Sequence, residues 1–255
     1  MEVELTRDEE FAILTLNRPE ALNALSFQIL REIGEALDEA ARSDARALLV
    51  TGAGEKAFCA GADIKELRNR SLTEQRAGAE LGHAAFGKLD RLPIPSVALV
   101  NGYAFGGGLE LALACTFRLA APKAKMGLPE IKLGLIPGYG GTQRLPRVIG
   151  PARALEMILT GRTVEAREAE KLGLVNRVVE GDLLAAGKAF AREFTSYGLP
   201  ALRLAREAVT RALDLPLHEG LMMEADLSTL AFQTEDAEEH MAAFEMKRKA
   251  AFKDR

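Results

Sequence analysis

The chain has 255 residues, of which 48% are hydrophobic and 27% are charged. This balance is ordinary for a globular protein and excludes an intrinsically disordered one. The net charge of −4 provides no overall attraction to nucleic acid or to anionic lipid. The chain lacks both a run of about 18 apolar residues, the minimum for a membrane span, and a basic, apolar leader. We therefore expect a cytoplasmic protein with no nucleic-acid or membrane partner.

The cysteines and histidines give no sign of a metal site. Cys59 and Cys115 lack metal-ligand spacing, and two thiols without an export signal favour a reducing compartment. His83, His218 and His240 are scattered along the chain. We expect no bound metal, because none of these histidines pairs with a cysteine or a second histidine at a spacing of three or four residues.

The first 150 residues show short apolar segments that alternate with helical patterns, which is typical of an α/β fold. Strands are predicted over residues 2–6, 10–16, 45–51, 96–100 and 117–121. Helices are predicted from the cap Ser26 to about Arg42, over 72–89 and over 108–114. From residue 151 onward helical patterns predominate, with one strand over 174–179 and a helical stretch over 217–252.

Three segments break local propensity, which is common at functional sites. In the first, residues 56–65, small residues surround Ala62, so that the backbone can approach a ligand closely. Asp63 is placed to cap a following helix. A plain strand-to-helix turn with a cap would explain this segment equally well.

The second segment, residues 101–111, places three glycines, Gly106–Gly108, before a helix. Bare N–H groups at a helix N-terminus favour an electron-rich partner. Glu110 follows among apolar residues, where a carboxylate is costly unless it is used or paired. The alternative is an acid that only stabilises the first helical turn.

The third segment, residues 127–143, sets Glu130 in apolar, glycine-rich surroundings. Gly138, Gly140 and Gly141 expose backbone before another expected helix. A plain loop explains these glycines, but it explains the isolated acid less well.

Glu110 and Glu130 are too far apart in sequence to share a helix face, so they meet only through the fold. Two carboxylates in an apolar pocket suit acid/base work, and two N–H groups from separate turns would form an oxyanion hole. No Ser-His-Asp or Cys-His arrangement is visible, so covalent acyl transfer is not favoured. The pattern indicates enolate chemistry beside an activated carbonyl, without a metal or an organic cofactor.

Five segments in order resemble the enoyl-CoA hydratase (crotonase) family. They are Asn17–Leu25 (NRPEALNAL), Ala60–Ile64 (AGADI), Asn101–Glu110 (NGYAFGGGLE), Pro129–Leu145 (PE followed by IPGYGGTQRL) and Phe244–Lys253, a basic C-terminal helix. The resemblance implies an α/β crotonase-like spiral of ββα turns over residues 1–195. It also implies a helical trimerisation region over residues 196–255, in a trimer or a hexamer built as a dimer of trimers.

The resemblance further implies an enoyl-CoA hydratase, which adds water reversibly and syn to a trans-2-enoyl-CoA to give a 3-hydroxyacyl-CoA. The N–H groups of Ala62 and Gly107 would hold the thioester oxygen. Glu110 would activate a water molecule for addition at C3, and Glu130 would pass its proton to C2. Gly138 would line the water pocket.

The same resemblance implies that CoA is part of the substrate and that no further cofactor is used. The substrate contacts carried over are Ala60, Ala62, Asp63, Ile64, Lys65, Gly107 and Gly138. Many relatives have a lysine where this chain has Glu20, and that lysine helps to hold a CoA phosphate. Lys56, Lys65 and Lys253 are the candidates to replace it here.

Other functions remain open at this stage. Within the family they are an enoyl-CoA isomerase, which often lacks the first glutamate, and a methylglutaconyl or branched-chain hydratase. Outside it, residues 52–57 fit the G-x-G-x-x-A pattern of a dehydrogenase, and the helical C-terminal third would suit a binding protein. Its methionines (Met222, Met223, Met241 and Met246) are expected in the core or in a subunit interface. Acyl chain length would be set within residues 72–89 and near Tyr139.

Overall fold

The computed structural model describes residues 2–255 and contains two sheets. The larger sheet has the strand order β1 (Val3–Asp8), β2 (Phe11–Leu16), β3 (Ala47–Gly52), β5 (Ser96–Val100), β7 (Phe117–Ala120) and β10 (Arg177–Val178). The hairpin β1–β2 is antiparallel and all other neighbours are parallel. The strands predicted over the first 150 residues are therefore present, with shifts of one or two residues at their ends.

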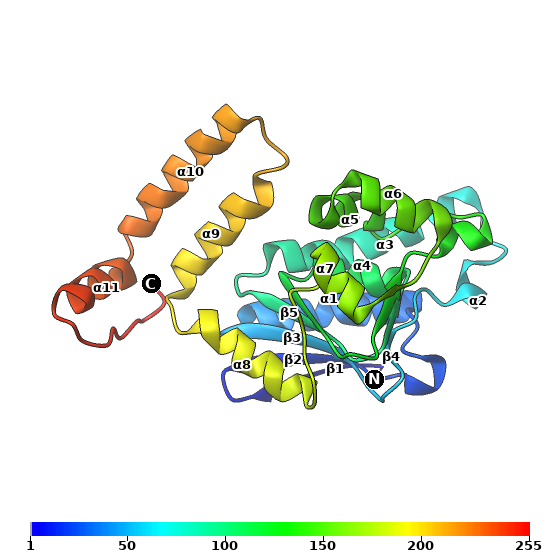
Figure 1. Cartoon of the computed structure of the whole chain (residues 1–255), viewed down its shortest axis with the longest axis horizontal. Coiled ribbons are helices and arrows are strands. Elements are labelled where there is room, and N and C mark those ends of the chain that lie inside the picture. Colours follow the sequence, from blue (N-terminus) through cyan, green and yellow to red (C-terminus); the bar gives the residue numbers. More distant parts are fainter. Residues whose placement is uncertain (1) are drawn as a thin grey trace.

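A smaller sheet was not predicted from the sequence. Its order is β4 (Ala57–Cys59), β6 (Tyr103–Phe105), β8 (Lys125–Gly127) and β9 (Val164–Glu165). Its first three strands each follow a strand of the large sheet and pair in parallel. A helical segment comes next in every case, so strand, strand and helix repeat along the chain (Figure 1). This repetition is the spiral of ββα turns that the resemblance implied.

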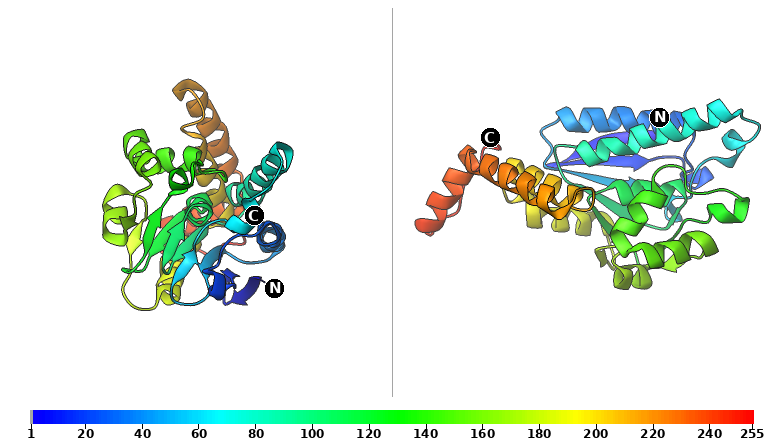
Figure 2. Two further views of the ribbon diagram at one scale, coloured as in Figure 1. Left: turned by 90° about the vertical axis from the view of Figure 1, so that its right-hand side faces the viewer. Right: turned by 90° about the horizontal axis from the view of Figure 1, so that it is seen from above.

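The large sheet is covered on both faces. Side chains alternate along its strands, so each strand contributes to two separate apolar layers. Leu48 and Val50 of β3 face the main core, which also holds α1 (Phe27–Arg42) and α3 (Leu72–Arg91). Ala47 and Leu49 face a second apolar layer against α8 (Leu183–Thr195). Both faces are therefore apolar, as is usual for parallel strands. Figure 2 shows α1 and α3 running side by side.

Helix starts follow the sequence closely. The Oγ of Ser26 accepts the N–H of Ile29 at 3.0 Å, which begins α1 at the predicted cap. Ser71 and Glu74 form a reciprocal capping box at the start of α3. The remaining elements before the C-terminal third are η1 (Pro19–Ala21), α2 (Ile64–Leu67), α4 (Gly107–Ala114), η2 (Glu130–Leu133), α5 (Gly141–Ile149), α6 (Pro151–Thr160) and α7 (Ala166–Leu172).

Helix α4 is buried along its whole length. It is apolar on every side apart from Glu110, as expected of a helix enclosed within a protein. It packs against β4 and β6 and against α3 and α5. Its first turn, with Glu110, is therefore fixed by the centre of the fold.

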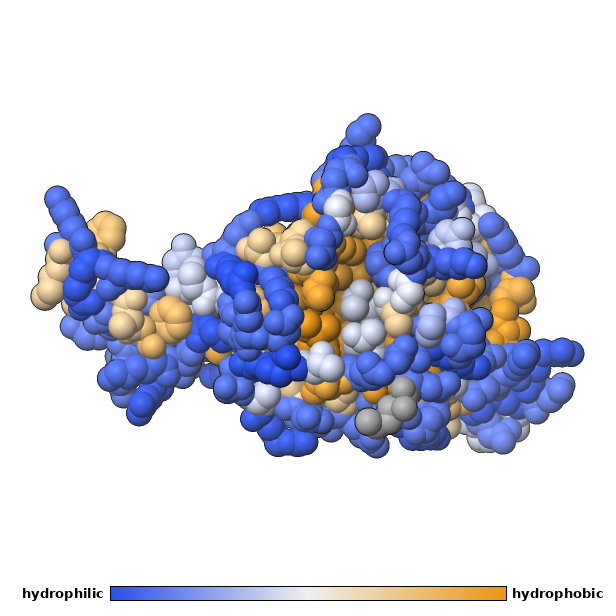
Figure 3. Space-filling view, turned by 90° about the horizontal axis from the view of Figure 1, so that it is seen from below, coloured by the Kyte–Doolittle hydropathy of each residue, from blue (hydrophilic) through white to orange (hydrophobic). Residues whose placement is uncertain are grey.

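Three helices, α9 (Leu199–Arg211), α10 (Leu217–Phe232) and α11 (Glu235–Glu245), extend away from the sheets with the last ten residues. We call residues 199–255 the C-terminal arm (Figures 1 and 2). Hydrophobic residues stand among hydrophilic ones on the arm at the left of Figure 3. Met222, Met241 and Met246 are exposed, so they do not belong to the core of this chain. None of the helices within residues 2–255 is long and apolar enough to cross a membrane.

The prediction of a basic helix over Phe244–Lys253 is wrong. Helix α11 ends at Glu245, and Lys247 adopts a positive φ of 52°, which turns the chain back. The buried carboxylate of Asp236 then accepts the N–H groups of Lys253 and Asp254 at 2.6 and 2.9 Å. The N–H groups of Lys253 and Asp254 thus bond to a carboxylate instead of to the backbone carbonyls that a helix would offer them.

Candidate active site

Glu110 lies in the first turns of α4 and is only 1% exposed. Its Oε1 accepts the backbone N–H of Tyr139 at 2.8 Å and of Gly141 at 2.7 Å. The carboxylate is therefore bound by the turn before α5, and it does not serve merely to stabilise its own helix. No described residue donates to Oε2 of Glu110.

The turn that holds Glu110 favours glycine at two positions, Gly140 and Gly141. Gly140 has a φ of +111°, which L side chains rarely adopt. A Cβ on Gly141 would lie 3.0 Å from both Cγ and Oε1 of Glu110. Gly138 is exposed and has nothing within 4 Å of a Cβ position. The glycines thus bring backbone against a protein carboxylate, whereas the sequence indicated only exposed backbone.

Glu130 is the first residue of η2 and is half-buried. Its Oε1 lies 3.0 Å from the position that a Cβ of Gly106 would take, so the carboxylate sits beside the turn that begins α4. Its Oε2 is buried, with no hydrogen-bond partner in the described chain. A buried carboxylate oxygen without a donor is costly.

Burial raises the pKa of both acids. The pKa of Glu110 rises to about 7, mainly because the carboxylate is desolvated. The Gly141 and Tyr139 amides and Arg144 lower it, whereas the negative charge of Glu130 raises it. Burial also raises the pKa of Glu130. The structure thus brings together the two acids that the sequence singled out, close enough for one charge to act on the other.

The turns that contain Ala62 and Gly107 are in contact. A Cβ on Gly61 or on Gly106 would lie 3.8 Å from the other residue's Cα, and each glycine directly precedes one of the two residues. Leu25 bonds to Gly61 and Asp63 in an isolated parallel bridge, which directs the Ala62 amide away from Leu25. Gly107 begins α4, so its N–H has no partner within the helix.

The three consecutive glycines serve more than exposure of N–H groups. Gly106 has a φ of +50°. A Cβ on Gly107 would come within 2.9 Å of Leu25 Cδ1 and 3.1 Å of Tyr139 Cδ2. A Cβ on Gly108 would lie 2.1 Å from the carbonyl oxygen of Cys59. Close packing on β4 therefore accounts for Gly108, whereas the sequence argument explained all three glycines together by N–H groups that face an electron-rich partner.

Most of the predicted CoA contacts lie near one another in the chain. Ala60–Lys65 lie together from the end of β4 into α2, where Asp63 caps the helix through the Lys65 N–H at 3.1 Å. Asp63 also pairs with Arg18 at 3.2 Å. Lys56 and Lys65 are exposed.

Lys253 is not brought to the two acids within this chain. Its Nζ lies 3.4 Å from a carboxylate oxygen of Glu235 in the C-terminal arm. The arm and α2 lie at opposite ends of the molecule (Figure 1).

The dehydrogenase alternative is wrong. Residues 52–57 lead into strand β4, whereas a dinucleotide site needs a helix directly after its glycines.

Across residues 2–255, no group of three or more His, Cys, Asp or Glu side chains is arranged to hold a metal ion.

Sequence reasoning missed the amides of Tyr139 and Gly141 and the side chain of Arg144. The glycines before α5 were a usable signal, because a helix N-terminus offers unpaired N–H groups to an anion. Nothing in the sequence linked them to Glu110, since the contact joins residues 31 positions apart.

Comparison with known proteins gives one consistent result. The family model described as enoyl-CoA hydratase/isomerase matches residues 6–255. A probable enoyl-CoA hydratase of Mycobacterium bovis is 49% identical over 98% of this chain and 96% of its own length. A crotonyl-CoA hydratase of Syntrophomonas wolfei is 43% identical over 97% and 96%. The crystal structure of an enoyl-CoA hydratase from Bacillus anthracis superposes with a TM-score of 0.95 at 40% identity, covering 100% of both chains. The chain therefore belongs to the enoyl-CoA hydratase/isomerase family.

Proposed function

We propose that this protein is an enoyl-CoA hydratase that adds water reversibly and syn to a trans-2-enoyl-CoA thioester. One observation carries the proposal: the buried Glu110 and the neighbouring, half-buried Glu130 each keep an oxygen to which no described residue donates. Those oxygens suit a single water molecule held between two carboxylates. Relatives named as hydratases, at 40–49% identity over nearly the whole chain, support the same reaction.

In the proposed reaction, Oε2 of Glu110 orients the water, whose oxygen bonds to C3 of the substrate. The π electrons of the double bond move towards the thioester carbonyl and form an enolate. The N–H groups of Ala62 and Gly107 stabilise that oxygen as it gains charge. Glu130 then passes the water's proton to C2, which gives the 3-hydroxyacyl-CoA.

Both parts of this machinery are needed for a fast reaction. Removal of one oxyanion-hole donor typically costs about 10²–10³ in rate. A positioned acid or base contributes about 10²–10⁴. The two factors multiply, and neither calls for a metal or an organic cofactor.

The CoA part of the substrate is proposed to lie along Ala60–Lys65, with Gly138 beside the water. Lys56 and Lys65 are exposed on this side and would pair with CoA phosphates in place of the lysine that many relatives have at position 20. Lys253 would take part only from a neighbouring subunit.

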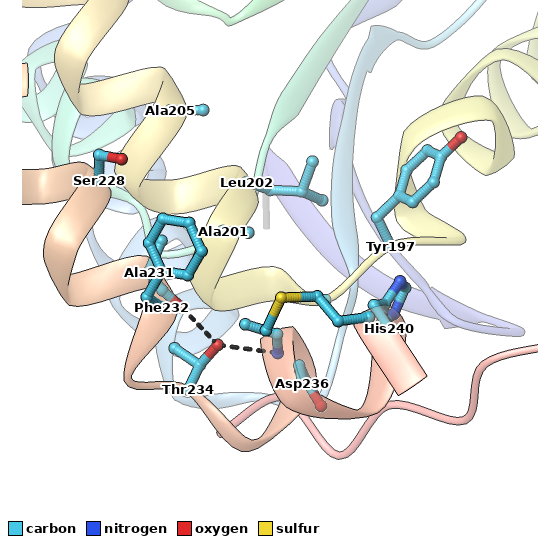
Figure 4. A pocket seen from close by; sticks show the side chains of 13 residues that line it. Tyr197, Ala201, Leu202, Ala205, Ser228, Ala231, Phe232, Thr234, Asp236 and His240 are labelled. Carbon is cyan, nitrogen blue, oxygen red and sulfur yellow. Dashed lines mark hydrogen bonds between the residues drawn. The ribbon is translucent and has the colours of Figure 1, made fainter. Parts of the chain in front are cut away.

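We also propose a trimer, or a dimer of trimers, built through the C-terminal arm. A cavity of about 520 Å³ opens between α9, α10 and α11, lined by residues such as Leu202, Ala205, Phe232 and Met241 (Figure 4). Phe232 and Met241 are exposed there. A second copy of the chain would remove this apolar surface from water.

The direct test is the loss of conjugated-thioester absorbance when the purified protein meets crotonyl-CoA. We expect rapid loss with formation of 3-hydroxybutyryl-CoA, and a series of longer and branched enoyl-CoA substrates would define the acyl preference. Absence of hydration, together with double-bond migration in a 3-enoyl-CoA, would overturn the proposal in favour of an isomerase.

A further inference from the structure

Arg144 holds the turn that binds Glu110 from its opposite side. It lies in α5, with a side chain 20% exposed. Its Nη1 donates to the carbonyl oxygen of Tyr139 at 3.3 Å, and its Nη2 donates to Oδ2 of Asp90 at 2.7 Å. The backbone N–H of Tyr139 meanwhile donates to Glu110. Glu110 and Arg144 therefore bind the two polar backbone groups of one residue.

The guanidinium also fills the space above the turn. A Cβ on Gly140 would lie 2.3 Å from Nη1 of Arg144, so the group packs directly on the glycine backbone. Asp90 belongs to α3, whose Gly82 and Phe86 pack against the Tyr139 ring. The Tyr139 ring therefore packs directly on α3, and the Tyr139 carbonyl is linked to α3 through Arg144 and Asp90.

We propose that Arg144, anchored by Asp90, is a positioning residue that fixes the Tyr139–Gly141 turn and thereby the Glu110 carboxylate. The proposal rests on the proposed function, in which Glu110 activates water. Arg144 touches neither the water nor the acyl group in this scheme. It acts through one backbone carbonyl and through its charge.

The planar fork of arginine matters because it binds two partners in different directions at once. A lysine would keep the positive charge, but its single ammonium group would not match the two directions. Loss of the turn's position moves the two amides that hold Glu110, and displacements of about 1 Å can cost on the order of 10²-fold in rate.

The charge of Arg144 acts on Glu110 within a set of neighbouring groups. The groups coupled electrostatically to Glu110 are Glu130 of η2, Arg144 of α5 and Tyr139 of the turn. Glu66, Arg70 and Cys59 act in turn on Tyr139, and Asp90 of α3 pairs with Arg144. Arg144 is the cation that acts on Glu110 itself, and it lowers the pKa of Glu110, whereas Glu130 raises it. Removal of the Arg144 charge should therefore raise the pKa of Glu110 further.

The test compares Arg144→Gln, Arg144→Lys and a matched control, Arg147→Gln. Arg147 lies in the same helix, donates to the Gln143 carbonyl at 2.9 Å and pairs with Asp214 at 2.9 Å, and neither bond involves Glu110 or the Tyr139–Gly141 turn. We expect Arg144→Gln to lower kcat for crotonyl-CoA about 10–100-fold with little change in KM. Its acidic pH limb should move to higher pH, and Arg144→Lys should restore the limb but only part of kcat.

Asp90→Asn provides a second variant that keeps the Arg144 charge and loosens its anchor. It should lower kcat without an alkaline shift of the limb. A folded Arg144→Gln with a wild-type pH profile and kcat would overturn the proposal, as would an equal shift in Arg147→Gln.

An infrared titration of the Glu110 carboxyl group, identified by the loss of its signal in Glu110→Gln, measures the same shift without turnover. A higher Glu110 pKa in Arg144→Gln would support the electrostatic link even if the wild type failed to hydrate crotonyl-CoA. An unchanged Glu110 pKa would overturn that link, whatever the outcome for the hydratase function.

Discussion

The Oε1 atom of Glu110 accepts the backbone N–H of Gly141 at 2.7 Å. This bond connects the central helix α4 to the first residue of α5, where a Cβ would press within 3.0 Å of the same carboxylate. The Tyr139 N–H binds the same oxygen, so the protein satisfies one side of the carboxylate with main-chain donors. No described residue donates to the other oxygen, Oε2, which the proposed reaction assigns to the water molecule.

Replacement of Glu130 by glutamine should lower kcat on crotonyl-CoA at least about 100-fold, because an amide cannot pass a proton to C2. Affinity for CoA should change little, since the proposed CoA contacts lie along Ala60–Lys65 and do not include the Glu130 side chain. Steady-state kinetics, with CoA inhibition as the control for binding, check this prediction. Unchanged turnover would exclude the role of Glu130.

Replacement of Glu110 by glutamine should slow hydration by a similar factor. In the proposed reaction, Glu110 must be ionised to accept a hydrogen bond from the water and orient it, so kcat should rise with pH through the Glu110 pKa of about 7. The residual activity of Glu110→Gln should lack this rise. A pH profile of kcat for both proteins decides the matter, and a variant near the wild-type rate would mean that another group activates the water.

The raised pKa of Glu110 also predicts a stability effect. The folded state binds this proton more tightly than the unfolded chain, whose carboxyl has its ordinary pKa of 4.5. The stabilisation is complete below about pH 4.5 and is lost as the pH rises through about 7. From pH 4 to pH 8 the wild type should therefore lose about 3 kcal/mol relative to Glu110→Gln. Denaturant unfolding of both proteins at the two pH values measures this difference, and parallel behaviour would contradict it.

Two glycine substitutions should act in opposite directions. Gly108→Ala places a Cβ 2.1 Å from the Cys59 carbonyl oxygen, so either α4 or β4 must move and the melting temperature should fall by several degrees. Gly87→Ala, inside α3, meets nothing within 4 Å and should stabilise by about 0.5–1 kcal/mol. Thermal unfolding of both variants checks the pair. Equal effects would contradict the close packing of α4 on β4.

Introduction of a charge on the C-terminal arm should disrupt assembly. Phe232 is 63% exposed and lines the cavity between the arm helices. Phe232→Glu should shift the mass measured by light scattering from a trimer or hexamer towards the monomer, because a carboxylate in an apolar interface is costly. Gln28→Glu, on the exposed face of α1, is the control. A monomeric wild type at micromolar concentration would contradict the proposed assembly.

The sequence predicted those parts of the fold that carry a long periodic pattern or a specific end signal. Helix α1 begins at the cap Ser26 and ends at Arg42 as expected, and β5 has the predicted bounds. The small sheet was missed because its strands are only two or three residues long. Such strands contain hardly one period of side-chain alternation, and their positions depend on parallel partners far along the chain.

In the candidate site, too, local features were predicted from the sequence and contacts between distant segments were not. Glu110 and Glu130 were found because an acid in apolar surroundings is conspicuous in a sequence. Their approach to one another, and the Glu110–Gly141 bond, depend on how α4, η2 and α5 meet, which no local pattern encodes. The helix expected over Phe244–Lys253 failed for a related reason, because the distant carboxylate of Asp236 captures the amides of the tail.

The contact between Gly61 and Gly106 has an evolutionary consequence. The two proposed donors, Ala62 and Gly107, are main-chain groups whose spacing is set where two glycines touch. A single substitution of a side chain cannot delete an amide that every residue other than proline possesses. If these amides hold the thioester as proposed, descendants of such a protein can remodel the walls around the acyl chain and acquire new preferences while the thioester contacts are inherited unchanged.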